Sequence, residues 1–156
     1  MSEANDNNKN NVSAVDFEQL VVGAADAIVV CDARGDITLW NSACERIFGF
    51  TSADALGRSL DLIIPERQRQ RHWDGYVKTM ETGITRYGTT LLKVPALHKE
   101  GRTLSIAFSV SLIKNSDGTV NAIVAIVRDE TERFAQDRAL KARLAQLEQG
   151  QKDSQT

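Results

Sequence analysis

One histidine combines a reactive side chain with apolar neighbours. The stretch RQRHWDGYVKTM contains His72, and on a helix its apolar side chains centre one face while His72 lies roughly 90° from that centre. These apolar residues are Trp73, Tyr76, Val77 and Met80. A neutral imidazole is the commonest protein ligand for iron, and an apolar pocket suits a porphyrin. His72 is therefore either a haem ligand or a solvated, hydrogen-bonded side chain without a metal.

The other reactive side chains indicate structural roles. Cys31 and Cys44 lack a second cysteine pair or a nearby histidine cluster, so we expect reduced, buried thiols and no zinc site. Glu66, Asp74 and Glu81 share the segment of His72 but form no pair suited to acid–base catalysis, which is typical of a solvated face. No glycine-rich phosphate loop is recognised. We therefore expect no enzyme activity.

Composition indicates one globular domain. The chain has 156 residues, 42% of them hydrophobic and 26% charged, which is enough for a single core. A net charge of −2 gives no electrostatic reason to expect nucleic acid or an anionic membrane. No apolar run approaches the ~20 residues that cross a bilayer, and the N-terminus does not resemble a secretory signal. We expect a cytoplasmic protein with neither a nucleic-acid nor a membrane partner.

Caps and apolar spacing predict the helices. Phe17, Leu20 and Val21 have the spacing of a short amphipathic helix. Capping boxes are predicted in the segments Ser42–Glu45 and Thr51–Asp54, each opening a short helix. Pro65 is a favourable first residue for the longer helix that carries His72.

Five extended segments predict the sheet. They are Ala27–Asp32, Ile37–Asn41, Tyr87–His98, Arg102–Ile113 and Thr119–Glu130. The fourth segment alternates, which predicts a half-buried antiparallel strand. Leu104, Ile106, Phe108, Val110 and Leu112 face one way, and Ser105, Ala107, Ser109 and Ser111 the other. We expect an α+β fold with five antiparallel strands, helices on one face and a cavity between the two.

The end of the chain has the composition of a signalling helix. Leu140, Leu144 and Leu147 have the a/d spacing of a coiled coil, although Arg133 and Asp137 precede them in that register. A helix this short must pack on something, so it either pairs with a second copy or folds back on its own sheet. The predicted boundaries are a disordered tail over 1–13, a core domain over 14–130, a coiled-coil-like helix over 131–149 and a second tail over 150–156.

Several local motifs resemble those of PAS sensor domains. They are AIVVCDARGDITLWNSACERIFGF, the GRSL…IIPE connection, the KEGR hairpin and the closing RDET. In that family the Asp129-x-Thr131 pair marks the junction where the last strand leads into a signalling helix. The resemblance implies a PAS fold and a role in sensing and signal transduction.

Within the family, the segment Pro65–Leu104 is most similar to the haem-binding PAS domain of oxygen-sensor histidine kinases. The resemblance implies that His72, seven residues after Pro65, is the axial ligand of haem b. Leu92 stands where those kinases carry a distal arginine, and Phe108 stands where they carry a smaller aliphatic residue. The predicted cofactor-binding set is His72, Tyr76, Leu92, Ile106, Phe108 and Val110.

Two functions remain open from the sequence. In the first, the domain binds haem or another small ligand and signals through its C-terminal helix to a separate output protein, such as a histidine kinase or regulator. In the second, the core holds no ligand and the domain is a protein–protein interaction or dimerisation module. In both, we expect a homodimer, and the N-terminal helix can join its interface.

Overall fold

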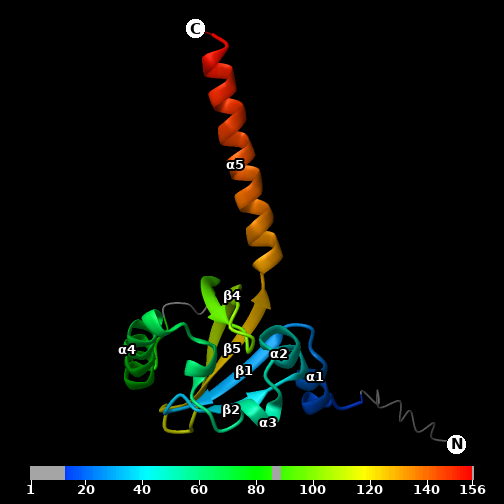
Figure 1. Ribbon diagram of the computed structural model, residues 1–156. Coiled ribbons are helices and arrows are strands. Elements are labelled where there is room, and N and C mark those ends of the chain that lie inside the picture. Colours follow the sequence, from blue (N-terminus) through cyan, green and yellow to red (C-terminus); the bar gives the residue numbers. More distant parts are fainter. Residues whose placement is uncertain (1–12, 86–88, 156) are drawn as a thin grey trace, which may run out of the picture.

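A computed structural model describes residues 13–85 and 89–155. The chain forms six helical segments and five strands within these ranges (Figure 1). In chain order they are α1 (Phe17–Gly23), β1 (Ala27–Asp32), β2 (Ile37–Trp40), α2 (Ser42–Phe48), α3 (Ser52–Ala55), the 3₁₀ helix η1 (Leu60–Ile63), α4 (Glu66–Thr82), β3 (Leu92–Leu97), β4 (Thr103–Lys114), β5 (Val120–Asp129) and α5 (Thr131–Asp153). Tyr87, where the third strand was predicted to begin, and most of the predicted N-terminal tail lie outside the described residues.

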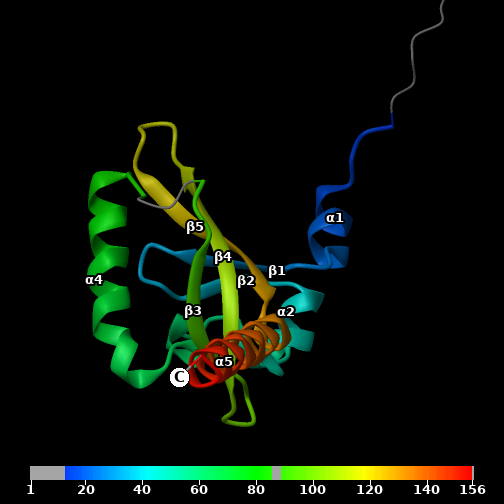
Figure 2. The ribbon, with the colours of Figure 1, turned by 90° about the horizontal axis from the view of Figure 1, so that it is seen from above.

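The strands form one antiparallel sheet in the order β2-β1-β5-β4-β3. The first strand therefore lies beside the last, while the helices α2 to α4 all occur between β2 and β3. Figures 1 and 2 show the five strands crossing the body, with α4 to their left and α2 to their right, and both helices contribute to the core on one face of the sheet. The predicted α+β architecture is confirmed.

The pleat separates a core face from an outer face. Val29 pairs with Ala125, which pairs with Val110, so these three side chains lie on the same, inward face. One position later, Ser109 pairs with Ile126 on the outer face. Ala107 is only 4% exposed although it shares the outer face. Its strand partners are Lys93 and Arg128, and long side chains of this kind shield a methyl group from water.

Two predicted helix starts differ from the structure. The N-cap of α2 is Asn41, whose side chain accepts a hydrogen bond from the Cys44 amide, so the predicted capping box at Ser42 is wrong. The same oxygen also accepts from the Ile28 amide at 3.0 Å, which ties the helix to β1. Pro65 is the N-cap of α4 and not its first residue. The predicted capping box of Thr51 and Asp54 is confirmed.

The two terminal helices leave their apolar side chains in solvent. α1 has no buried residue, and its Phe17 is 73% exposed. α5 extends away from the body as a single helix (Figure 1), and Leu140, Leu144 and Leu147 are 66%, 57% and 59% exposed. These leucines therefore do not fold back on their own sheet. The helix also continues to Asp153, past the predicted end, because an exposed helix tolerates a glycine such as Gly150.

No helix within residues 13–85 and 89–155 has both the length and the apolar composition that crossing a bilayer demands.

Candidate ligand cavity

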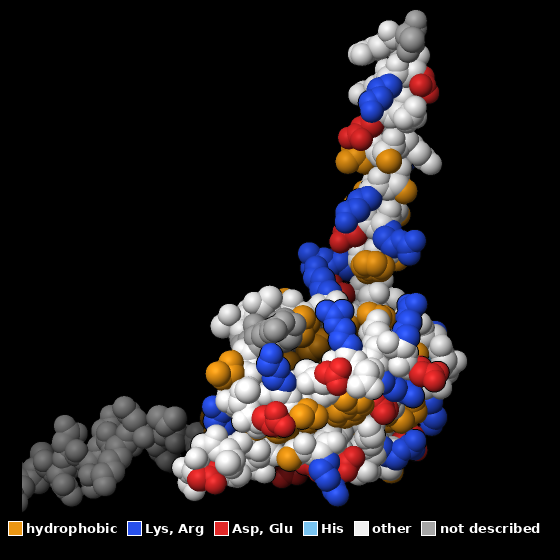
Figure 3. Space-filling view, turned by 90° about the vertical axis from the view of Figure 1, so that its left-hand side faces the viewer, with side chains coloured by type: hydrophobic (Ala, Val, Ile, Leu, Met, Phe, Trp, Pro, Cys, Tyr) orange, Lys and Arg blue, Asp and Glu red, His pale blue; other side chains and the backbone are white. Residues whose placement is uncertain are grey.

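A cavity of about 560 Å³ lies between the sheet and α4. This volume falls within the ~300–1,000 Å³ range of small-molecule sites. Figure 3 looks at the side of the molecule that carries α4 and shows a hollow with hydrophobic side chains at its floor. Inward residues of all strands except β2 contribute to the lining, together with η1 and one face of α4.

The sheet supplies an apolar wall. Ile106, Phe108 and Val110 of β4 line the cavity, as their alternation predicted. Leu92 lines it from β3, where it pairs with Phe108. Phe108 is only half-buried because its ring borders this space instead of being packed on all sides. The structure therefore brings together the strand residues of the predicted cofactor-binding set.

The wall supplied by α4 is unexpectedly polar. The helix presents Gln68, Arg71, His72 and Thr79 to the cavity, together with Gly75 and Tyr76. These residues follow the i, i+3, i+4 spacing of one helix face. The prediction that Val77 lies at the centre of a buried face is wrong, since Val77 is 53% exposed. Helix α4 does not pack flat on the sheet but stands across the cavity from it.

Contacts near the middle of α4 fix this orientation. The indole N–H of Trp73 donates to Asp61 Oδ1 at 2.7 Å, and the Arg69 guanidinium donates to the Asp61 carbonyl at 3.3 Å. Tyr76 donates its hydroxyl proton to the carbonyl of Asp32 on β1. One residue of η1 and one of β1 therefore set which face of the helix meets the cavity.

His72 is the least satisfied group in the cavity. Its Nδ1 atom is buried and is the one such side-chain nitrogen or oxygen in the described part of the chain without a hydrogen-bond partner. Burial lowers the pKa of His72, and the nearby Asp61 carboxylate opposes this only in part. The imidazole is accordingly neutral at pH 7. A neutral ring whose nitrogen lacks a partner, beside an apolar wall, is chemically ready to bind a ligand atom.

The two cysteines are not poised to bind or react with a ligand. Cys31 lines the cavity and Cys44 is a buried residue of α2, and both are free and buried, as predicted. Burial raises the pKa of each thiol to about 12. Both therefore stay protonated at neutral pH and are poor nucleophiles.

A hydrogen-bonded junction links the cavity strand β4 to α5. The Ser105 amide donates to the Thr131 hydroxyl at 3.0 Å, and the Glu130 amide donates to the Ser105 carbonyl at 2.8 Å. The Thr131 hydroxyl in turn donates to Asp129 Oδ1 at 2.5 Å. The next residue of β4, Ile106, lines the cavity and pairs with Asp129. The first turn of α5 is thus held by β4 as well as by its own strand.

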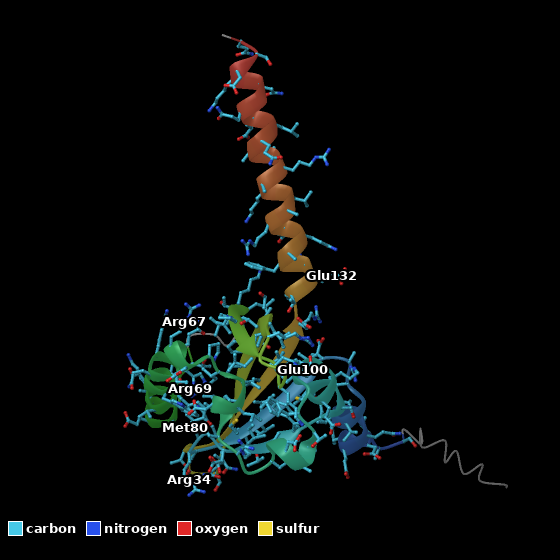
Figure 4. All side chains as sticks on the ribbon, in the orientation of Figure 1. Arg34, Arg67, Arg69, Met80, Glu100 and Glu132 are labelled. Atoms are coloured by element: carbon cyan, nitrogen blue, oxygen red, sulfur yellow. The ribbon has the colours of Figure 1, made fainter. Side chains whose placement is uncertain are left out.

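Figure 4 shows α4 and the start of α5 in different parts of the molecule. Arg67 and Arg69 on α4 lie well apart from Glu132 on the first turn of α5. The hydrogen bonds that hold the start of α5 come from β4 and β5.

Comparison with known proteins identifies the fold family. The sequence profile of the family described as PAS domain matches residues 25–132, which is most of the chain. This chain belongs to the PAS domain family. A PAS domain structure from Colwellia psychrerythraea superposes with a TM-score of 0.65 at 22% identity, covering 74% of this chain and 95% of that one. An RNA-binding light-oxygen-voltage receptor superposes equally well at 22% identity, over 86% of this chain and 37% of that one.

Relatives of this PAS domain occur within longer signalling proteins. The sensor protein FixL of Bradyrhizobium diazoefficiens is 30% identical over 130 residues, which is 79% of this chain and 23% of that protein. The oxygen sensor protein DosP of Escherichia coli is 25% identical over 120 residues, or 77% of this chain and 14% of that protein. The chain thus spans less than a quarter of the length of these relatives. As a PAS domain related to signal-transduction kinases, it is a sensory module.

Two residues that organise the site were missed by sequence reasoning. Asp61 sits in an apolar connection, and its bond to Trp73 joins residues twelve apart in a geometry that no local pattern predicts. Ser105 was expected only to face away from the cavity, whereas its backbone holds the start of α5.

Proposed function

We propose that this PAS domain is a sensor that binds a small molecule in the cavity between its sheet and α4. The observation that carries the proposal is the buried, unpartnered Nδ1 of His72 at the cavity wall. Leaving such an atom without a partner costs about 1–3 kcal/mol, and a ligand that supplies the partner removes that cost.

Haem b is the cofactor that we propose for this cavity. The neutral imidazole of His72 supplies the axial donor, and the apolar side chains of Ile106, Phe108 and Val110 suit a porphyrin face. When bound, haem iron supplies a site for a diatomic gas. Leu92 offers no hydrogen-bond donor to such a gas, and the bulk of Phe108 restricts its access. FixL and DosP are named as sensors, and DosP as an oxygen sensor, which supports this assignment.

We propose that the signal leaves through α5 to a separate output protein, such as a histidine kinase or regulator. The junction of Ser105 and Thr131 provides the physical link. The exposed stripe of Leu140, Leu144 and Leu147 favours a parallel dimer through α5, with α1 contributing its exposed apolar side chains. The domain itself carries no catalytic role in this proposal and acts in the cytoplasm.

An absorption spectrum of the protein mixed with haemin tests the cofactor. We expect a Soret band that is lost in His72→Ala and retained in Lys78→Ala, a control on the exposed side of α4. Circular dichroism of both variants checks that they are folded. Full haem loading of His72→Ala would exclude His72 as the axial ligand.

The exposed leucines also favour a second function, that of a dimerisation module with no ligand. Sedimentation of the intact chain and of a chain truncated after Arg133 tests the role of α5. We expect a dimer that becomes a monomer on truncation. Two monomers at tens of micromolar would contradict dimerisation through α5. A dimer that binds no haemin and releases no small molecule on denaturation would support the second function over the first.

A further inference from the structure

The charges around the cavity all have one sign. Of the described residues that line it, none is Asp or Glu, whereas Arg71 is cationic; Lys93 borders the cavity too, but its side chain lies on the outer face of the sheet. This bias is unexpected in a chain with 21 acidic and 19 basic residues. Within residues 13–85 and 89–155, neither Arg71 nor Lys93 forms an ion pair.

Arg71 lies where the cavity meets solvent. It is exposed although it lines the cavity, and it immediately precedes His72 on the polar face of α4. Figure 3 shows Lys and Arg side chains beside the hollow. Asp74, three residues further along α4, accepts a hydrogen bond from Gln70, and Asp61 is engaged by Trp73 and Arg69. The guanidinium of Arg71 is thus not neutralised from within the described chain.

A cleft with apolar walls and one sign of charge focuses its electrostatic potential on whatever enters. Apolar strand residues face a helix wall on which Gln68 and Arg71 offer hydrogen-bond donors. A ligand that matches both walls has an apolar body and an anionic group on one edge. We infer that the cavity selects an amphipathic organic acid whose carboxylate faces Arg71. This inference rests on the proposed ligand cavity and names the chemistry that the cavity takes.

Two sources supply this chemistry, namely a free organic acid and a porphyrin with its own carboxylates. Octanoate and octanol share one chain and differ in the charged head group, so this pair of probes tests a free acid. Haemin and its dimethyl ester test the porphyrin in the same way. Titration calorimetry at low ionic strength gives the dissociation constants for the wild type, Arg71→Gln and Arg67→Gln. Arg67 is an exposed residue of α4 that does not line the cavity, which makes it a matched control.

We expect at least one acid to bind about fivefold more tightly than its neutral analogue, which is the scale of a partly exposed ion pair. The preference should disappear in Arg71→Gln, persist in Arg67→Gln and weaken with added salt. A preference confined to octanoate identifies a free acid, and one confined to haemin identifies porphyrin carboxylates. Equal binding of acid and neutral analogue in the wild type overturns the inference but leaves the cavity proposal standing. Absence of binding by all four probes overturns both.

Discussion

Replacing His72 with leucine is expected to stabilise the ligand-free protein while it removes haem binding. The buried Nδ1 has no partner, so the imidazole contributes a desolvation cost without a compensating hydrogen bond. Because the ring as a whole is only half-buried, we take the lower end of the ~1–3 kcal/mol range for an unsatisfied group, or about 1 kcal/mol. Leucine has a similar size, and its better helix propensity adds a few tenths of a kcal/mol (~0.3).

Urea unfolding measures this difference, and a gain of about 1 kcal/mol should raise the melting temperature by about 2–4 °C in a chain of this size. His72→Gln is the matched control, since glutamine has about the same helix propensity as leucine but keeps a polar group at the wall. It should show no such gain. A leucine variant less stable than the wild type at pH 8 would mean that the imidazole has a hydrogen-bond partner, and the reasoning would be refuted.

The pH dependence provides an independent check. The pKa of His72 in the folded protein lies below its ordinary value of 6.5 because of burial. As the pH falls below about 6.5, the unfolded chain takes up a proton that the folded chain refuses, so the free energy of unfolding decreases. His72→Leu lacks this titration, and its advantage over the wild type should be larger at pH 5.5 than at pH 8. An advantage that does not change with pH would show that the histidine titrates normally.

Three further perturbations test the packing and the junction. Phe108→Ala should cost less than the roughly 3–5 kcal/mol of a fully packed ring, about 2 kcal/mol in urea unfolding, because the ring borders the cavity; a larger loss would mean a closed core. Gly35→Ala should destabilise the protein more than Gly57→Ala in the same assay. Both glycines have positive φ, but only at Gly35 would an added Cβ lie 2.2 Å from a tryptophan ring carbon. Equal losses of stability in the two variants would argue against that contact. Thr131→Val should cost about 1 kcal/mol and speed hydrogen exchange at the Ser105 amide, and unchanged exchange would contradict the junction.

The strands were largely predictable because their constraint is local. Successive side chains on a pleated strand must alternate, so Ile106, Phe108 and Val110 share a face wherever the strand lies. The burial of that face then follows from composition alone. The hairpin turn at Asn115–Gly118 is equally local, since the Gly118 amide donates to the Asn115 carbonyl within the same four residues.

The orientation of α4 was not predictable because its contacts are not local. Placing Val77 at the centre of a buried face assumes that the apolar side of a helix packs on the sheet. The bond from Tyr76 to Asp32 spans 44 residues and turns the helix so that Arg71 and His72 meet the cavity. The predicted capping box of α2 was wrong for a related reason. The Asn41 side chain accepts a hydrogen bond from the Ile28 amide on β1 as well as from its own helix, and a local sequence pattern does not reveal that contact.

Because α5 is long, a small rotation at its first turn displaces its far end by a larger distance. Its 23 residues extend over about 35 Å at 1.5 Å per residue. A tilt of about 5° at the first turn therefore displaces the far end by about 3 Å, which is comparable to half the pitch of a helix. Only Glu130 separates β5 from α5. The hydrogen bonds of Ser105 with Glu130 and Thr131 restrict the motion of this connection. A shift too small to disturb the packing around the cavity thus becomes large enough at the tip to change the helix pairing of the proposed dimer.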